Sequence, residues 1–141
     1  MDLALLTGQR PADVLKLKRA DIRDGALWII QNKTGARLGI EITGELAAVI
    51  ARIQARPGTA ISPFLIQDEN GQPLHQRTLR SRFDKARELA KVAFQFRDIR
   101  AKAATDTGDL AHSQRLLAHK NRQMTEHYVK SRTGDRVKPL R

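Results

Sequence analysis

The sequence predicts a mainly α-helical fold with a small antiparallel β-sheet of about three strands. Apolar residues recur at helical spacing through most of the 141-residue chain, and one stretch alternates like two strands joined by a turn. The composition is 40% hydrophobic with one Trp and four Phe, so we expect a core of Leu, Ile, Val and Ala. A chain of this length suits one domain.

The charge indicates a polyanionic partner. Twenty-six Lys and Arg residues against 15 Asp and Glu residues give a net charge of +11, and such cations can neutralise phosphates and release counterions. The alternative is a basic but inert surface. Membrane association is not expected, because no apolar run approaches the roughly 20 residues that cross a bilayer and the N-terminus lacks the basic region of a signal peptide.

The chain has no cysteine, which excludes a disulfide framework and a cysteine-based metal site and fits a reducing cytoplasm. His112, His119 and His127 could suggest a metal site, but their spacing fits no common ligand pattern and no carboxylate cluster accompanies them. We therefore expect no metal.

Two short helices open the chain. The first is apolar and stops at Gly8, a residue suited to the left-handed turn beyond a helix end. Pro11 begins the second, expected over residues 11–18, with Asp13 in a first turn where the helix dipole favours a carboxylate. Arg10 thus lies in a tight connection between two helices, close to Asp13. The alternative is that Arg10 and Asp13 form an ordinary surface ion pair without a functional role. Because the chain starts within a helical pattern, we expect an N-terminal portion to be missing.

A β-hairpin follows. Residues 26–30 have the β-branched and aromatic content of a strand, residues 32–35 form a turn, and residues 37–42 return. Lys33 is therefore expected near the hairpin tip, where most lysines merely add solubility. Residues 64–66 are expected to add a third strand.

The remainder is predicted to be helical. Thr43 can cap a helix that buries Leu46, Val49, Ile50 and Ile53. A helix over residues 76–90 is expected to bury Leu79, Phe83, Ala86 and Leu89 and to expose a basic face of Arg77, Arg80, Arg82, Lys85 and Arg87.

A further helix places Arg97 and Arg100 one turn apart. Residues 110–118 form the next helix, with Leu116 and Leu117 buried, and residues 122–130 form the last, which carries Tyr128. The basic tail over residues 131–141 is expected to be mobile unless a partner holds it.

Five segments in register resemble the tyrosine recombinases, or phage integrases. Thr7-Gly8-Gln9-Arg10-Pro11-Ala12-Asp13 is similar to the family's T-G-x-R-x-x-E/D motif, and Asn32-Lys33-Thr34-Gly35 to its lysine-bearing hairpin. Arg97-Asp98-Ile99-Arg100 stands where the family has H-x-x-R, and Leu116-Leu117-Ala118-His119 where it has L-L-G-H. Tyr128, nine residues after His119, falls at the nucleophile position. The resemblance covers residues 3–130 and implies the catalytic-domain fold of that family.

The resemblance also implies a chemistry: DNA strand cleavage and rejoining through a 3′-phosphotyrosine link, without a metal or high-energy cofactor. It implies Tyr128 as the nucleophile, Arg10 and Arg100 as a clamp on the phosphate oxygens, and Lys33 as the acid for the leaving 5′ hydroxyl. His119 would donate a hydrogen bond to the phosphate, and Asp13 would support the arginine corner. A phenol, with a pKa of about 10, needs help to lose its proton.

Two positions depart from the family pattern. Arg97 stands where the family has histidine, and arginine cannot act as a general base, although it can bind phosphate. Ala118 replaces the glycine before His119, which strains the helix end if a left-handed conformation is required there. We therefore expect slower chemistry. A catalytically degraded DNA-binding remnant is the alternative, and a type IB topoisomerase-like relaxing enzyme is a more distant one.

The implied partner is double-stranded DNA. The residues expected to contact it besides the catalytic ones are Arg77, Arg80, Lys102 and Lys120. The resemblance further implies a tetramer on two DNA sites, with a monomer in the absence of DNA. The catalytic domain is expected over residues 1–130 and the tail over residues 131–141, and these residues alone are expected to bind DNA weakly without the family's N-terminal core-binding domain.

Overall fold

The computed structural model describes residues 1–56, 62–134 and 137–139 and confirms the predicted fold class. Within these residues the helices are α1 (Asp2–Thr7), α2 (Pro11–Leu15), α3 (Gly44–Gln54), α4 (Gln76–Leu89), α5 (Phe96–Asp106), α6 (Leu110–Leu116) and α7 (Arg122–Thr133), with a 3₁₀ turn η1 (Arg19–Asp21). The antiparallel sheet has the order β1-β2-β3, from β1 (Ile22–Arg23), β2 (Ala26–Ile30) and β3 (Arg37–Glu41). None of the described helices could span a membrane.

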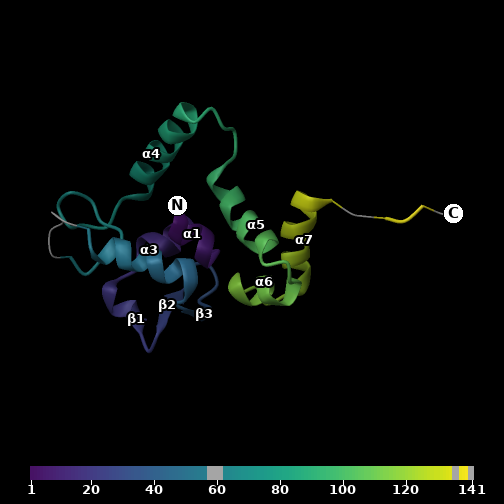
Figure 1. Cartoon of the computed structure of the whole chain (residues 1–141), viewed down its shortest axis with the longest axis horizontal. Helices are drawn as coiled ribbons and strands as arrows, with labels where there is room; N and C mark the ends of the chain where they lie inside the picture. Colours follow the sequence, from purple (N-terminus) through teal and green to yellow (C-terminus); the bar gives the residue numbers. More distant parts are fainter. Residues whose placement is uncertain (57–61, 135–136, 140–141) are drawn as a thin grey trace.

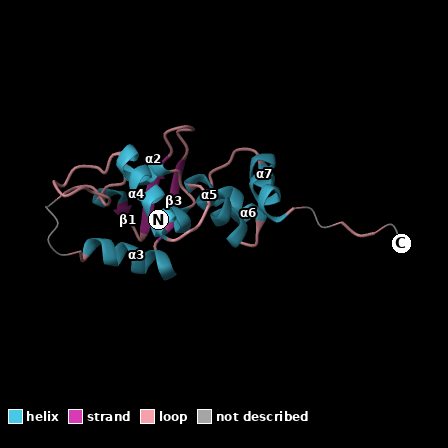
Figure 2. Cartoon of the chain, turned by 90° about the horizontal axis from the view of Figure 1, so that it is seen from above, coloured by secondary structure: helices cyan, strands magenta, loops and turns pink. Residues whose placement is uncertain are grey.

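The elements form two groups joined by α5. The sheet lies against α1 and α3, whereas α6 and α7 lie on the other side of α5 (Figure 1). Helix α5 packs against both α1 and α7, so it connects the N-terminal and C-terminal parts of the chain. Seen from above, α3 lies along one edge of the first group, opposite the loops that lead into α4 (Figure 2).

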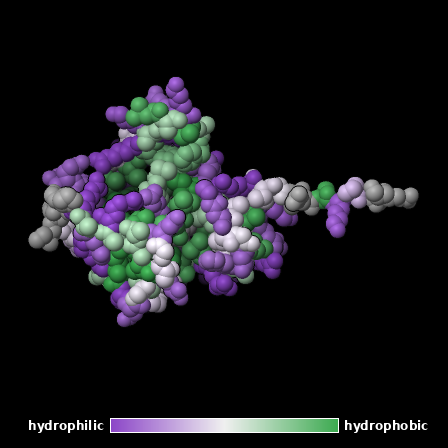
Figure 3. All heavy atoms as spheres, in the orientation of Figure 1, coloured by the Kyte–Doolittle hydropathy of each residue, from purple (hydrophilic) through white to green (hydrophobic). Residues whose placement is uncertain are grey.

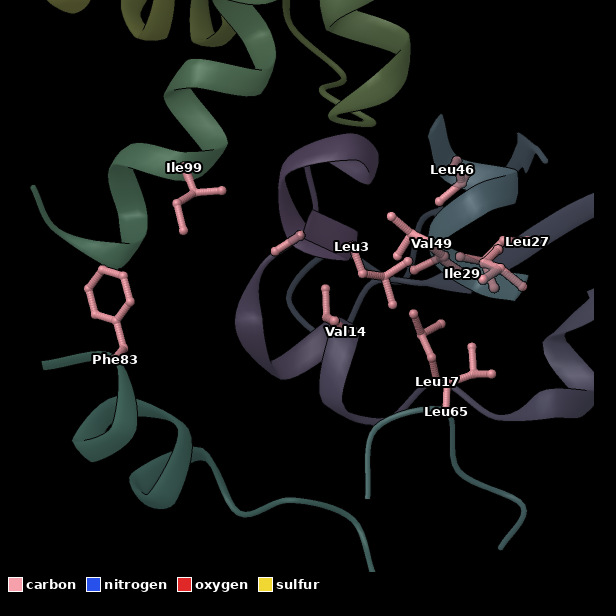
Figure 4. Close-up of a cluster of buried hydrophobic side chains, with 12 residues drawn as sticks. Leu3, Val14, Leu17, Leu27, Ile29, Leu46, Val49, Leu65, Phe83 and Ile99 are labelled. Atoms are coloured by element: carbon pink, nitrogen blue, oxygen red, sulfur yellow. The ribbon is translucent and has the colours of Figure 1, made fainter. Parts of the chain in front are cut away.

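The main core lies between α1, α3 and the sheet. Strand β2 alternates, so Leu27 and Ile29 point inward and meet Leu3 of α1 and Val49 of α3 (Figure 4). Leu27 and Ile29 are at most 1% exposed, and burying an aliphatic side chain of this size contributes about 1.5–3 kcal/mol. This core fixes the hairpin relative to the first helices.

Helix α4 joins the structure through an aromatic contact. The Phe83 ring packs edge-to-face against Phe94 and Phe96, with centroids 5.5 and 5.0 Å apart, and Phe83 and Ile99 lie together at one side of the core (Figure 4). The predicted inward positions Ala86 and Leu89 are wrong, because the C-terminal half of α4 projects from the body and Leu89 is 77% exposed. Apolar atoms accordingly reach the surface around α4 (Figure 3).

The third strand is not the predicted one. Residues 64–66 form no strand of the sheet: Phe64 makes only an isolated bridge to Lys18. Ile22–Arg23 supplies β1 instead, joined to β2 by Asp24 and Gly25, both with positive φ (53° and 71°). An Asp-Gly pair with this geometry makes the tight turn that suits a hairpin.

Several helix ends differ from the sequence prediction. Helix α2 ends at Leu15 rather than Lys18, and α6 ends at Leu116, which is half-buried, whereas Leu117 is fully buried. Helix α7 continues through Lys130 and ends at Thr133 rather than at Lys130. Thr43 occupies the predicted N-cap position of α3, but its side chain makes no capping hydrogen bond.

Two residues with a left-handed backbone conformation follow the ends of helices α1 and α6. Gly8 ends α1 at φ 65°, and a Cβ there would lie 3.0 Å from Leu117 Cδ2, so glycine is required by both conformation and space. Ala118 follows α6 at φ 52° without that freedom. The strain predicted at Ala118 is therefore present, next to His119.

We predict that Ala118→Gly stabilises the protein by about 1 kcal/mol, because a left-handed conformation costs an L-residue about that much. Urea unfolding measures the change. The matched control is Ala48→Gly, at a solvent-exposed position in the middle of α3. This substitution should lower the free energy of unfolding by about 1 kcal/mol. A destabilised Ala118→Gly protein would contradict the assignment of strain to this residue.

Candidate active site

Arg10 lies in the short connection between α1 and α2. It occupies the N-cap position of α2 in an extended conformation (φ −71°, ψ 153°), and Pro11 follows as the first helical residue. The side chain is half-buried, and its Nη1 atom is fully buried with no hydrogen-bond partner among the described residues. A buried cationic N–H group without a hydrogen-bond partner destabilises the folded protein, and an anionic ligand would satisfy it.

Arg100 on α5 joins three segments of the chain. Its Nη1 donates to the Gly8 carbonyl at 2.5 Å, and its Nη2 donates to the Leu117 carbonyl at 2.9 Å. Nη2 also lies 3.3 Å from Nε2 of His119. The side chain of Arg100 is only 5% exposed, so these bonds replace the water that a guanidinium would otherwise bind.

The charge around Arg100 is mostly positive. Burial, and then the nearby cation Arg10, lower the pKa of Arg100, while Tyr128 and Asp13 act in the opposite direction. Arginine nevertheless remains protonated in proteins. The corner therefore holds two neighbouring cations beside the Tyr128 phenol, a field that attracts an anion.

His119 is held by two partners. Its Nδ1 lies 2.9 Å from Thr125 Oγ1, and Nε2 faces Arg100. Because a guanidinium can only donate, Nε2 is the acceptor and Nδ1 carries the proton toward Thr125. Burial, followed by the charges of Arg100 and Arg10, lowers the pKa of His119 to about 4. His119 is therefore neutral at pH 7, and its N–H does not face the arginines.

Tyr128 lies on α7 next to this histidine. The two ring centroids are 5.4 Å apart, and Thr125, which holds His119, lies one helical turn before Tyr128. Tyr128 is half-buried and close enough to Arg100 to affect its pKa. The neighbouring His127 is exposed on the helix surface, as the sequence predicted.

The hairpin places Lys33 in solvent but fixes the backbone beside it. The backbone N–H of Asn32 donates to Asp13 Oδ1 at 2.7 Å, and Lys16 Nζ donates to the carbonyl of Ile30 and to Asn32. Asp13 is 1% exposed and pairs with Lys16 at 3.5 Å. Among the described ion pairs Asp13 has Lys16 as its partner, and it also affects the pKa of Arg100. Asp13 therefore holds the hairpin, and its support of the arginine corner stays a prediction.

Two buried glutamines were not predicted as part of the site. Gln9 and Gln31 are 2% and 1% exposed, and Gln31 Nε2 donates to Gln9 Oε1 at 2.7 Å. Gln9 adjoins Arg10, and Gln31 precedes Lys33 by two residues. The alternation of β2 could have identified Gln31, because positions 27, 29 and 31 share the inward face and the last of them is polar.

Arg97 lies on α5 one helical turn before Arg100. It is exposed and lines an open cavity of about 340 Å³ with Arg80 of α4 and Pro11. Among the described hydrogen bonds of Arg100 and His119, none is made with the side chain of Arg97 or Lys33.

The other predicted DNA contacts are dispersed. Arg77 and Lys120 are exposed. Lys102 pairs with Asp106 and lines a separate apolar cavity with Met1 and Leu5, two residues beyond Arg100 and so on the far side of α5.

The structure thus brings together Arg10, Arg100, His119 and Tyr128 from four separate segments, and it holds the Lys33 hairpin alongside. A phenol next to two guanidinium groups can attack a bound phosphate, since the cations neutralise the charge that develops on phosphorus. No group of three or more potential metal ligands occurs in the part of the chain that the structure describes.

Comparison with known proteins identifies the family. The model of the phage integrase family matches residues 1–134. The integrase of Escherichia phage HK022 is 35% identical over 94% of this chain, and the prophage integrase IntE of Escherichia coli K12 is 32% identical over 91%. The chain spans 40% of the length of the phage HK022 integrase and 39% of the length of IntE.

Solved structures agree. A lambda integrase dimer bound to a core site superposes with a TM-score of 0.82 at 25% identity, covering 98% of this chain and 53% of the other. The lambda integrase catalytic core has a TM-score of 0.73 at 26% identity, covering 84% of this chain and 80% of the other. The residues matched by the family model include Arg10, the Lys33 hairpin and helix α7 with Tyr128. The chain belongs to the phage integrase family.

Proposed function

We propose that this chain is the catalytic domain of a site-specific DNA recombinase that cleaves and rejoins strands through a 3′-phosphotyrosine intermediate. The observation that carries the proposal is the convergence of Tyr128, Arg100, Arg10 and His119 around one cationic corner. The solved relatives add support, since they include a lambda integrase tetramer bound to a Holliday junction (TM-score 0.83, 25% identity over 97% of this chain and 43% of the other).

The proposed cleavage is an exchange of one phosphate ester for another. Tyr128 Oη attacks phosphorus, a new P–O bond to tyrosine forms, and the bond to the 5′ oxygen breaks, so the energy of the ester is kept for rejoining. Arg10 and Arg100 stabilise the non-bridging oxygens, and preorganised donors of this kind contribute on the order of 3–4 kcal/mol each. The buried Nη1 of Arg10 and Nε of Arg100, which have no partner among the described residues, are the donors free for this role.

Two protons must move. The Lys33 ammonium gives one to the departing 5′ oxygen once the hairpin tip meets the DNA. The phenol releases the other to solvent, because Arg97 cannot accept it. His119 orients Arg100 through Nε2 in the DNA-free protein, so the predicted donation of a hydrogen bond from His119 to the phosphate requires the ring to turn or to gain a proton.

The proposed DNA-binding surface includes four exposed cations, namely Arg77, Arg80, Arg97 and Lys120. Lys102 is left out of it because of its position on the far side of α5. We propose that residues 1–130 act as the catalytic unit, that residues 131–141 form an appended segment, and that the chain works in the cytoplasm as a homo-oligomer, a tetramer on DNA.

The adduct test decides the proposal. In a duplex nicked a few nucleotides to the 3′ side of the cleavage site, attack releases a short fragment that carries the free 5′ hydroxyl. This fragment diffuses away, so the covalent protein–DNA product accumulates. The wild-type chain is expected to form an adduct that survives denaturing electrophoresis, and Tyr128→Phe is expected to form none, because it lacks the attacking oxygen. The matched control is His127→Ala, at the exposed neighbour of Tyr128, which should retain the adduct.

Equal adduct from wild type and Tyr128→Phe would overturn the assignment of the nucleophile. The alternative of a degraded DNA-binding remnant would be favoured if the wild-type chain formed no adduct but bound DNA with an affinity that falls with salt as expected for several phosphate contacts.

The replaced histidine gives a second prediction. Arg97→His is expected to raise the single-turnover rate of adduct formation on the order of tenfold, because an imidazole can take a proton that a guanidinium cannot. Arg80→His, which changes the other arginine of the same cavity, should weaken DNA binding without raising the rate. Equal rates in wild type and Arg97→His would show that this position does not limit the chemistry.

His119 makes folding stability depend on pH. Its pKa is about 4 in the folded protein, against 6.5 for an unperturbed histidine, so the unfolded chain binds more protons between these pH values. Stability is therefore expected to fall as pH decreases from about 6.5 to about 4, by at most about 3 kcal/mol from this residue.

Urea unfolding of wild type and His119→Gln at pH 7, 5.5 and 4.5 isolates this contribution, since other groups titrate equally in both proteins. Glutamine can still accept from Arg100 and donate to Thr125. His127→Gln, at an exposed site, should keep the wild-type slope, and an unchanged slope in His119→Gln would contradict the lowered pKa.

A further inference from the structure

The buried glutamines Gln9 and Gln31 connect the three segments that carry the proposed catalytic groups. Gln9 belongs to the arginine corner, Gln31 begins the turn that carries Lys33, and both donate to the end of α6 before His119. Both are at most 2% exposed. Glutamine is rarely buried to this extent, so the pair needs an explanation beyond packing.

All the amide donors of the pair are used. Gln31 Nε2 donates to Gln9 Oε1 at 2.7 Å and to the Leu117 carbonyl at 3.0 Å. Gln9 Nε2 donates to the carbonyls of Thr7 and Leu116, both at 2.8 Å. A fully satisfied buried network of this kind fixes one arrangement of its members.

Gln31 extends this network into the hairpin turn. Thr34 Oγ1 donates to Gln31 Oε1 at 2.8 Å, and the Gly35 N–H donates to the Gln31 carbonyl at 2.8 Å. Lys33 lies between these bonded residues, so its backbone position follows from that of Gln31.

The arginine corner has a second anchor that does not involve glutamine. Arg100 already joins the Gly8 carbonyl to the Leu117 carbonyl. Loss of the Gln31 amide therefore leaves the corner tied to the end of α6. The hairpin, in contrast, would lose its side-chain hydrogen bonds to Gln9 and to the end of α6, so its turn would be held by the bonds to Asp13 and Lys16 and by the packing of β2 in the core.

We propose that Gln31, held by Gln9, is a positioning residue that sets the Lys33 turn in register with the arginine corner. The inference rests on the proposed function, because it assigns Lys33 the task of protonating the 5′ oxygen as the P–O bond breaks. Loss of the Gln31 amide should slow proton donation from Lys33 to the leaving group but leave the stabilisation of the phosphate by the arginines unchanged.

A change of leaving group separates these two effects. In a substrate with sulfur in place of the bridging 5′ oxygen, the departing group is a thiolate, which needs no proton because thiols are far more acidic than alcohols. Defects in proton donation disappear with this substrate, whereas defects in phosphate binding, nucleophile position or folding remain. The measured quantity is the ratio of adduct formation rates with the oxygen and sulfur substrates.

Gln31→Met keeps the length of the side chain and removes its donors. It is expected to slow adduct formation about tenfold or more with the oxygen substrate and less than twofold with the sulfur substrate, a smaller version of the pattern expected for Lys33→Ala. Equal slowing with both substrates, or no slowing, would sink the inference while leaving the proposed function intact. No adduct from wild type with either substrate would overturn both.

Thr34→Val keeps the inference testable if Gln31→Met does not fold. Thr34 is exposed, so the substitution leaves the core unchanged and removes two bonds of the hydroxyl, the one donated to Gln31 Oε1 and the one accepted from the Ala36 N–H. A loss of several-fold confined to the oxygen substrate is expected. The matched control is Thr105→Val, which removes a hydroxyl that donates to the Ala101 carbonyl within α5 and should match wild type with both substrates. Identical behaviour of Thr34→Val and Thr105→Val would count against the role of Gln31.

Discussion

The structure depends on one buried cation. Taking a guanidinium out of water costs several kcal/mol unless its donors are satisfied. Both terminal nitrogens of Arg100 are satisfied by the carbonyls of Gly8 and Leu117 and the imidazole of His119, whereas its Nε has no partner among the described residues. None of these partners carries a negative charge. The positive charge is therefore held by dipoles and left largely unneutralised, so the same contacts that connect α1, α5 and α6 also maintain the field of the candidate site.

The local elements were largely predictable because their signals are local. Glycine ended α1, proline began α2, and alternation marked β2 and β3. The third strand was missed because a two-residue strand such as β1 has no periodicity, although the Asp24-Gly25 turn was a usable signal. The exposure of Leu89 was also missed, since helical spacing shows which residues share a face but not where the neighbouring element ends.

For the site, motif order predicted the residues but not their contacts. The grouping of Arg10, Arg100, His119 and Tyr128 agrees with the resemblance. The contacts of Asp13 with Asn32 and Lys16 could not be predicted, because they depend on how β2 packs against α2, which spacing along the chain does not specify. The buried glutamines became visible only through their long-range hydrogen bonds.

Those long-range bonds have a consequence for how the protein is made. Arg100 and Gly8 are 92 residues apart in the chain, and Gln9 and Leu116 are 107 apart. Contacts with such large sequence separation form only when the ends of the chain meet, and closing these large loops is slow. The candidate site is therefore assembled only when these loops are closed, and a chain in which they are open holds its reactive groups apart.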